Sequence, residues 1–329
     1  MEIDPDIESF REWVPIRVYR EGEELFVDWC HMGTERFTRP FFEDSVNARL
    51  RRPFSLLFRR QTPIEFLGKI YEGSRGVRPT GFIFHTSRCG STLVSQMLAS
   101  TAKNIVISEP PPIDSILRAD TGSVLVSDEM RITWLRWIIN AFGQIRDQTE
   151  ERLFVKFDSW STTELGLVRR AFPDVPWIFL YRSPLEVIVS QMDQRGVHMV
   201  PGLIPGILPG INTEHVLQLQ HEEYCARVLE RICRSALENT GDRQGLFVNY
   251  SELPGAVTAK LAGHFGLDLS AAEIEKMNSA ARFNAKTPKL DFEPDTERKN
   301  RSATHTARAA ARWLDPLYIQ LEEISQRAA

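Results

Sequence analysis

Residues 81–98 read GFIFHTSRCGSTLVSQML, which is the pattern of an apolar strand, a tight loop and a helix. The loop holds Gly90, and the helix opens on Ser91 and Thr92. A helix N-terminus offers unpaired N–H groups and the positive end of its dipole, and Arg88 adds a permanently charged donor. The loop is therefore predicted to hold a phosphate-like anion. The alternative is an ordinary strand-to-helix turn, because Ser and Thr are common at helix starts.

This loop differs from the nucleoside-triphosphate loop GxxxxGK[ST]. The residue after Gly90 is Ser91 rather than Lys, and Arg88 lies upstream of the glycine. No loop lysine is therefore in place for ATP. The missing lysine argues against a P-loop kinase-like phosphotransferase, which is kept as the second interpretation of this loop.

A second stretch, residues 177–192, reads WIFLYRSPLEVIVSQM. It predicts an apolar strand that ends on Arg182, a turn at Ser183-Pro184, and a helix that carries Ser190. Ser190 lies about two helical turns beyond the strand end, so both side chains can reach one anion. The alternatives are a pairing of Arg182 with Glu186 one turn on and a Ser190 hydroxyl bonded to its own helix.

Together the two stretches resemble the sulfotransferase family, whose members use 3′-phosphoadenosine 5′-phosphosulfate (PAPS) and have a P-loop-like fold. The stretch Arg88-Cys89-Gly90-Ser91-Thr92 is similar to the family's [KR]-x-G-[ST]-T loop around the 5′-phosphosulfate. Arg182 and Ser190, eight positions apart, resemble the family's Arg and Ser on the 3′-phosphate. The resemblance covers roughly residues 80–300. It implies PAPS as co-substrate and PAP as product.

In motif spacing the likeness is closest to the tyrosylprotein and Golgi-type branch. Residues 153–160, LFVKFDSW, resemble the segment that supplies a lysine near the transferring group, here Lys156. Residues 106–112, VISEPPP, resemble the segment with a catalytic glutamate, here Glu109. Tyr250 lies in 246–254, which resembles the family's late strand, and Arg298-Lys299 partly matches its late basic element. The histidine base of the cytosolic branch has no equivalent downstream.

The resemblance implies transfer of a sulfuryl group to a hydroxyl or amine. Glu109 is then the candidate general base, and Lys156 and Arg88 are candidates to stabilise the leaving phosphate. The alternatives are that Glu109 is a solvated loop residue and that Lys156 extends from a strand end to solvent. The acceptor is expected to be a small molecule or a peptide. A non-catalytic module that binds PAP or another nucleotide is a third interpretation of the chain.

The composition limits the kinds of partner that the protein is expected to bind. The 329 residues carry a net charge of −4, so nothing favours nucleic acid or an anionic surface overall. The four cysteines lack metal spacing and the seven histidines are scattered, so no metal is expected and each histidine is interpreted as a satisfied surface or core residue. No apolar run is long enough to insert across a membrane, and no signal peptide is recognised. A cytoplasmic protein is expected; the sequence leaves the oligomeric state open.

From residue 82 onward strands alternate with helices, which predicts an α/β fold in three layers with a mainly parallel sheet flanked by helices. The expected strands are 82–85, 104–107, 153–156, 177–181 and 246–249; the expected helices are 91–101, 129–143, 161–171, 184–192 and 213–238. Ser161–Glu164 and Ser270–Glu273 match capping boxes. Ligands bind at the carboxyl ends of parallel strands, where Arg88, Glu109, Lys156 and Arg182 are all expected.

Four segments lie outside this pattern. Alternation around Gly22 predicts a β-hairpin over 14–29, so residues 1–78 are interpreted as an N-terminal extension and 79–329 as the main domain. A basic stretch from Arg49 to Arg60 is interpreted as a solvated face or a contact for an acidic partner, with acceptor recognition as the alternative.

Residues 197–211 contain three Pro-Gly pairs among apolar residues and are interpreted as a lid, or else as a loop packed on the core. The tail, 306–324, predicts two helices with a break.

Overall fold

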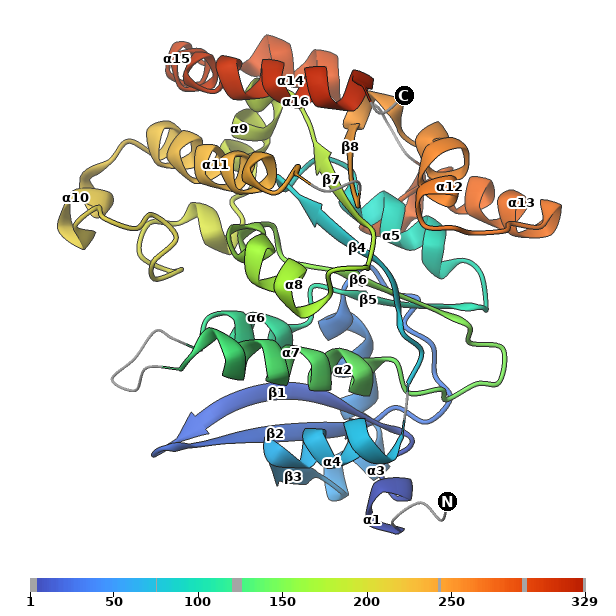
Figure 1. The fold of residues 1–329 in the computed structure, drawn as a ribbon. Helices are drawn as coiled ribbons and strands as arrows, with labels where there is room; N and C mark the ends of the chain where they lie inside the picture. The colour runs from blue at the N-terminus through green and yellow to red at the C-terminus, as the bar shows by residue number, and fades with distance from the viewer. Residues whose placement is uncertain (1–4, 75, 120–125, 242–243, 292–294, 328–329) are drawn as a thin grey trace.

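A five-stranded, wholly parallel sheet forms the centre of the computed structural model, which describes residues 5–327 except 75, 120–125, 242–243 and 292–294 (Figure 1). Its strand order is β5-β6-β4-β7-β8. The five predicted strands are thereby confirmed, each within a few residues of its expected bounds. They are β4 (Pro79–His85), β5 (Asn104–Ser108), β6 (Arg152–Lys156), β7 (Trp177–Tyr181) and β8 (Gly245–Asn249).

Each strand is apolar on both faces because helices cover the sheet on both sides. On one face Ile83 and Ile178 pack in a cluster with side chains of α5 (Ser91–Ala99) and α13 (Ala271–Ala280). On the other face Phe84 and Phe179 belong to a larger cluster with residues of α7 (Asp128–Phe142), α8 (Leu165–Ala171), α9 (Pro184–Asp193) and α11 (His221–Glu238). The predicted three-layer α/β architecture is confirmed.

Most predicted helices form with shifted ends. The segment expected as one helix over 213–238 is two helices separated at Leu219 and Gln220, and the helix expected at 91–101 ends at Ala99. The capping box at Ser270–Glu273 is confirmed. The one at Ser161 is wrong, because a 3₁₀ turn already begins at Ser159 and the Ser161 hydroxyl bonds Asp114 instead. Besides α7, α8, α9 and α11, the helices between β5 and β8 are α6 (Pro111–Leu117) and α10 (Thr213–Gln218).

The N-terminal part contains the predicted hairpin. Strands β1 (Trp13–Glu21) and β2 (Glu24–His31) pair antiparallel, and β3 (Arg60–Pro63) extends them to a three-stranded sheet. This small sheet packs on α6 and α7, so its apolar face joins the larger core cluster. The helices between its strands and after it are α2 (Phe42–Leu50), α3 (Pro53–Leu57) and α4 (Glu65–Gly73).

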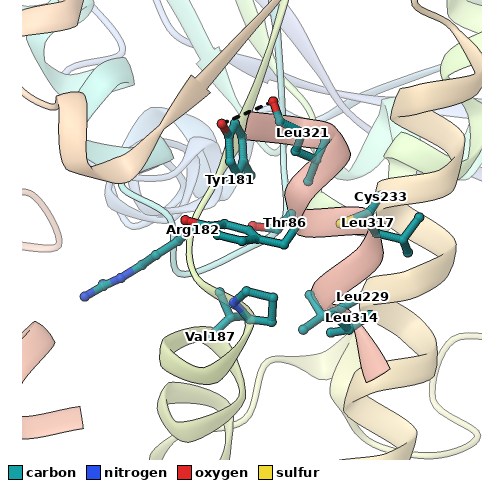
Figure 2. A pocket seen from close by; sticks show the side chains of 11 residues that line it. Thr86, Tyr181, Arg182, Val187, Leu229, Cys233, Leu314, Leu317 and Leu321 are labelled. Carbon is teal, nitrogen blue, oxygen red and sulfur yellow. Dashed lines mark hydrogen bonds between the residues drawn. The ribbon is translucent and has the colours of Figure 1, made fainter. Parts of the chain in front are cut away.

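The tail forms α15 (His305–Trp313) and α16 (Asp315–Arg327), as the sequence predicts. Figure 2 shows α16 laid against the end of β7, where the Tyr181 hydroxyl donates to the carbonyl of Leu321 at 3.3 Å. The cavity between Leu229, Cys233 and Leu317 holds about 10 Å³, which suffices for one water. This contact is therefore packing and not a ligand site.

The Pro-Gly segment begins with a 3₁₀ turn, Val197–Met199, and continues as a series of turns. Gly202, Gly206 and Gly210 all have positive φ, which explains a glycine after each proline. Met199 and Ile207 are buried in the larger core cluster, whereas Leu203 is 56% exposed. The segment is thus anchored in the core at Met199 and Ile207, whereas its Pro-Gly turns are exposed, and only its first residues line the cleft described next. No helix within the described residues is long and apolar enough to cross a membrane.

Candidate functional site

A cleft of about 830 Å³ opens at the carboxyl ends of the central strands. Its volume is in the range of small-molecule sites. The loop after β4, the residue after β5, the ends of β6 and β7 and the first turn of α5 meet there. The electrostatic environment of the cleft is positive. On its wall, burial and then the positive charges of Arg88 and Lys156 lower the pKa of Lys286 to about 8.

The loop at the floor of the cleft has an unusual backbone. Ser87, Arg88 and Gly90 have φ values of 70°, 53° and 82°, all in the left-handed region. Left-handed residues in such a loop turn successive N–H groups toward one concave side, which suits an anion. A Cβ at Gly90 would lie 2.6 Å from Leu253 Cδ1, so the position excludes larger residues. Non-glycine residues in this region cost roughly 1–3 kcal/mol each, so the surrounding contacts must enforce the shape.

Glu109 and Lys156 form a direct ion pair beside this loop. Their Oε1 and Nζ atoms are 2.7 Å apart, and the Lys156 side chain is fully buried, so Lys156 does not extend to solvent. Lys156 also lies 3.5 Å from the Thr92 hydroxyl, and this places its ammonium between Glu109 and the first turn of α5. Glu109 itself has a φ of 55° and donates its N–H to the carbonyl of Lys156 at 2.7 Å.

His85 connects this pair to the anion loop. Its Nδ1 accepts the backbone N–H of Ser87 at 3.0 Å, so the neutral ring carries its proton on Nε2. Nε2 lies 3.1 Å from the carbonyl of Phe157 and 3.4 Å from Glu109 Oε1. One buried imidazole therefore fixes both the loop backbone and the Glu109 carboxylate.

The charges explain the ionisation of this group. Burial alone would raise the pKa of the Glu109 carboxyl, but Lys156 and His85 outweigh burial and hold that pKa far below its usual range. Asp158 behaves in the opposite way. Burial, followed by the nearby Glu109 and Asp114, raises its pKa well above the usual value. The site thus keeps Glu109 anionic next to a neighbouring acid that favours its neutral form.

A second cationic group lies at the ends of β7 and α9. Arg182 donates from Nε to Glu186 at 2.6 Å and from Nη2 to Asp295 at 2.7 Å, and its guanidinium lies 3.9 Å over the ring of Tyr250. Lys299 pairs with the other Asp295 oxygen at 2.7 Å. The predicted alternative, a pair between Arg182 and Glu186, is therefore present. Asp295 places a carboxylate between two buried cations, which is a position that suits an anion.

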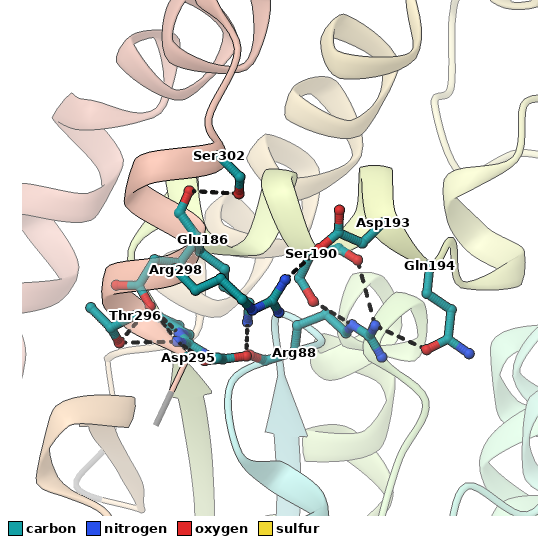
Figure 3. A network of polar contacts seen from close by, with 11 residues as sticks. Arg88, Glu186, Ser190, Asp193, Gln194, Asp295, Thr296, Arg298 and Ser302 are labelled. Carbon is teal, nitrogen blue, oxygen red and sulfur yellow. Dashed lines mark hydrogen bonds and ion pairs between the residues drawn. The ribbon is translucent and has the colours of Figure 1, made fainter. Parts of the chain in front are cut away.

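Arg88 belongs to this second group and not to the Glu109 pair. Figure 3 shows its guanidinium beneath α9, where Nε donates to Ser190 Oγ at 2.8 Å and Nη2 to Gln194 at 3.3 Å. The Ser190 hydroxyl thus bonds Arg88, whereas the sequence alternative had it bonded to its own helix. Arg298 is 64% exposed and pairs with Asp193 at 3.4 Å, on the outer edge of the same network.

The structure brings most of the predicted residues to one cleft. Cys89 and Lys156 are the exceptions, since both side chains are fully buried. Cys89 lies in the cluster beneath α5, and Lys156 lies behind the cleft wall, in contact with Glu109 and Thr92. The sequence interpretation missed His85, which a simple rule could have found because it is the last residue of a parallel strand. It also missed His198, because this residue follows α9 and no strand end in the sequence indicates that the chain reaches the cleft again there.

His198 is buried but not fully satisfied, which corrects the sequence interpretation. Its Nε2 lies 3.2 Å from Ser159 Oγ, and its ring lies 5.2 Å from that of Trp160 at 34°. Its Nδ1 has no hydrogen-bond partner among the described residues. Burial, followed by the charge of His85, lowers the pKa of His198 to about 3.

This imidazole makes folding sensitive to acid. Between about pH 6.5 and 3 the unfolded chain binds a proton at His198 and the folded chain does not, so stability is lost as the pH falls through that window. We expect His198→Phe to remove up to about 1.4 kcal/mol per pH unit from the slope of unfolding free energy against pH. Urea unfolding of both proteins between pH 7 and 5 measures the slopes. Parallel slopes would mean that His198 is protonated in the folded protein.

Comparison with known proteins gives weak likenesses only. A sulfotransferase domain from the Synechococcus PCC 7002 olefin synthase is 17% identical, with 73% of this chain and 96% of that chain covered and a TM-score of 0.43. A sulfotransferase from Alicyclobacillus acidocaldarius is 14% identical, with 76% and 96% covered and a TM-score of 0.43. A mouse sulfotransferase solved with PAP is 14% identical, with 80% and 90% covered and a TM-score of 0.40. No family model and no curated protein sequence matches the chain.

Proposed function

We propose that this protein transfers the sulfuryl group of PAPS to a hydroxyl or amine of an acceptor. The observation that carries the proposal is that two separate cationic positions lie at one cleft. Lys156, buried directly behind Glu109 and Thr92 of the cleft wall, and the first turn of α5 form one position, and Arg182 with Lys299 forms the other. A nucleotide with phosphates on both its 3′ and 5′ positions needs two such positions, whereas ADP or ATP needs one.

The residues present fit this co-substrate. The loop Arg88-Cys89-Gly90-Ser91-Thr92 offers backbone N–H groups, two hydroxyls and a helix N-terminus for a 5′-phosphosulfate. Arg182, Ser190 and Lys299, with Arg298 at the rim, offer charge-assisted hydrogen bonds for a 3′-phosphate. Tyr250 already lies against the Arg182 guanidinium at 3.9 Å, so it helps to orient that group. Asp295 has to yield its place between Arg182 and Lys299 to the incoming phosphate.

In the proposed reaction the acceptor oxygen or nitrogen attacks sulfur. The bond from sulfur to the 5′-phosphate oxygen breaks, and the acceptor's proton passes to Glu109. Sulfuryl transfer resembles phosphoryl transfer, in which the protein positions the partners and stabilises the charge that develops on the leaving oxygen. We assign that stabilisation to Lys156, and its contacts with both Glu109 and Thr92 support this.

Glu109 is a weak base as long as Lys156 holds its carboxylate. As negative charge grows on the leaving phosphate, the Lys156 ammonium is attracted away from Glu109, and the carboxylate gains proton affinity at the stage where the acceptor loses its proton. His85 acts as a positioning residue here, since it holds both Glu109 and Ser87. The low pKa of the resting carboxyl and its role as base are thus compatible.

Titration calorimetry with PAP, and with ADP alongside, tests the nucleotide. We expect PAP to bind at least about a hundredfold more tightly than ADP, because the 3′-phosphate adds two or more charge-assisted hydrogen bonds. Equal binding of PAP and ADP would exclude a 3′-phosphate site and with it the proposed co-substrate. Selective PAP binding without transfer to any acceptor would favour the non-catalytic module.

Substituting Arg182 locates the 3′-phosphate position. We expect Arg182→Ala to weaken PAP binding about a hundredfold and ADP binding little, and Ser190→Ala to weaken PAP binding about tenfold. Arg234→Ala is the matched control, because Arg234 is an exposed arginine that pairs with Glu230 at 2.8 Å on α11. Near-wild-type PAP affinity in a folded Arg182→Ala protein would restrict Arg182 to its pairs with Glu186 and Asp295.

A further inference from the structure

An exposed apolar segment with arginines on both sides lies away from the cleft. Residues 51–60 read RRPFSLLFRR, and α3 (Pro53–Leu57) forms their centre. Phe54, Leu56, Leu57 and Phe58 are 45%, 59%, 78% and 56% exposed. The other exposed large apolar residues are scattered along the described chain. Four neighbouring exposed side chains of this size form a patch that calls for a partner.

The segment is held in place at both ends. Arg49 donates from Nε to the carbonyl of His31 at 2.8 Å, and Arg60 donates to the carbonyl of Ser9 at 2.7 Å. On the inner side the Phe54 ring lies 4.7 Å from His31 and 4.9 Å from Phe58. The apolar side chains are therefore presented from a fixed turn on the N-terminal sheet.

Within the segment itself the charge is of one sign, although Glu35 and Glu12 lie at its inner side. Residues 49–60 contain five arginines and no acidic residue, in a chain whose net charge is −4. Arg49 and Arg60 are engaged with backbone carbonyls, and Arg52 pairs with Glu35 at 2.9 Å. Arg51 and Arg59, one on each side of the apolar residues, are exposed. Apolar side chains between two exposed arginines suit a partner surface that has an outer layer of negative charge and an apolar layer beneath it.

We propose that residues 51–59 dock the protein on the interface of an anionic lipid membrane, with the Phe and Leu side chains among the acyl chains and Arg51 and Arg59 at the headgroups. Basic residues beside a small apolar face are the general pattern of interfacial binding. A second copy of the chain is a weaker match, because stable protein interfaces use about 20–30 residues a side and these exposed apolar residues span five. The patch is independent of the nucleotide cleft, so this proposal does not rest on the proposed function.

Co-sedimentation of the full chain with phosphatidylcholine vesicles, with and without phosphatidylserine, tests the proposal. We expect binding that needs phosphatidylserine and weakens with salt. The paired variants L57S/F58S and R51Q/R59Q should each lower the partition coefficient about tenfold or more. The controls are L203S and R20Q: Leu203 is 56% exposed on another segment, and Arg20 lies at the far end of the β1–β2 hairpin.

Three results would overturn the proposal: no vesicle binding by the wild-type protein, equal binding to both vesicle types, or equal losses in the control variants. A lipid-free dimer that L57S/F58S dissociates, seen by light scattering, would assign the patch to a second copy instead. Unchanged PAP affinity and an unchanged circular dichroism spectrum in the variants show that the fold and the cleft are intact.

Discussion

Glu109→Gln should lower sulfuryl transfer by about 10²–10⁴-fold while PAP binds as tightly as before or more tightly. General base catalysis contributes rate factors of this size, and the amide cannot accept the acceptor's proton. PAP affinity should not fall, because the variant removes the anion that now pairs with the Lys156 ammonium at 2.7 Å. A phosphate group can then take over Lys156 without competition. Single-turnover rates and calorimetric titration with PAP measure the two effects separately.

The control for this variant is Glu150→Gln. Glu150 is a buried carboxylate that accepts the N–H of Arg146 at 2.7 Å, and it does not line the cleft. Loss of a buried carboxylate as such should lower stability in both variants, whereas only Glu109→Gln should stop the reaction. Transfer within about threefold of wild type in Glu109→Gln would exclude Glu109 as the base, because general bases typically contribute about 10²–10⁴-fold.

The sequence predicted the sheet well because each central strand is a short apolar run buried on both faces. Ile83, Ile178 and Phe179 are all fully buried, so no polar residue interrupts the pattern. The prediction of helix starts was less accurate where a local sequence motif competed with tertiary packing. Ser161 and Glu164 match a capping box, yet Ser161 lies inside a 3₁₀ turn because Trp160 is held by a 2.7 Å hydrogen bond to Asp114 on another helix.

The candidate site was predictable in its residues but not in their pairing. The family resemblance implied that Arg88 and Ser190 contact different phosphates of one ligand, yet their direct 2.8 Å contact depends on how far α9 lies from the loop. The carboxylate of Asp295 between Arg182 and Lys299 is likewise a long-range arrangement. Sequence spacing constrains residues on one helix or strand, whereas these contacts join elements about 100 positions apart in the chain.

Lys156→Met should abolish transfer and destabilise the fold by about 3 kcal/mol at pH 7.5. Removal of one partner of a buried pair costs about 3–5 kcal/mol, because the other charge remains without compensation. We expect a cost at the lower end of this range, because the Glu109 side chain is 21% exposed and keeps some contact with water. Urea unfolding measures the stability, and single-turnover transfer measures the activity.

The double variant Glu109→Gln with Lys156→Met separates this explanation from simple loss of packing. With both charges gone, we expect it to be more stable than Lys156→Met alone by about 1–3 kcal/mol, although still inactive. Additive losses would mean that the two side chains contribute independently, and that the 2.7 Å pair does not hold the Glu109 carboxylate in the folded protein.

The pH dependence of Lys156→Met supplies an independent check on the same pair. In the wild-type protein Lys156 and His85 depress the pKa of Glu109, so this carboxylate stabilises the fold above the unfolded-state pKa of about 4.5, and that stabilisation is lost as the pH falls below it. Without Lys156 only His85 opposes burial, which is the largest influence on this carboxyl, so the pKa of Glu109 should rise. A carboxyl with a raised pKa favours folding as it becomes protonated. The stability deficit of Lys156→Met should therefore shrink as the pH falls from 7.5 to about 5. A deficit that is constant over this range would mean that Lys156 stabilises the fold through packing and not through the charge of Glu109.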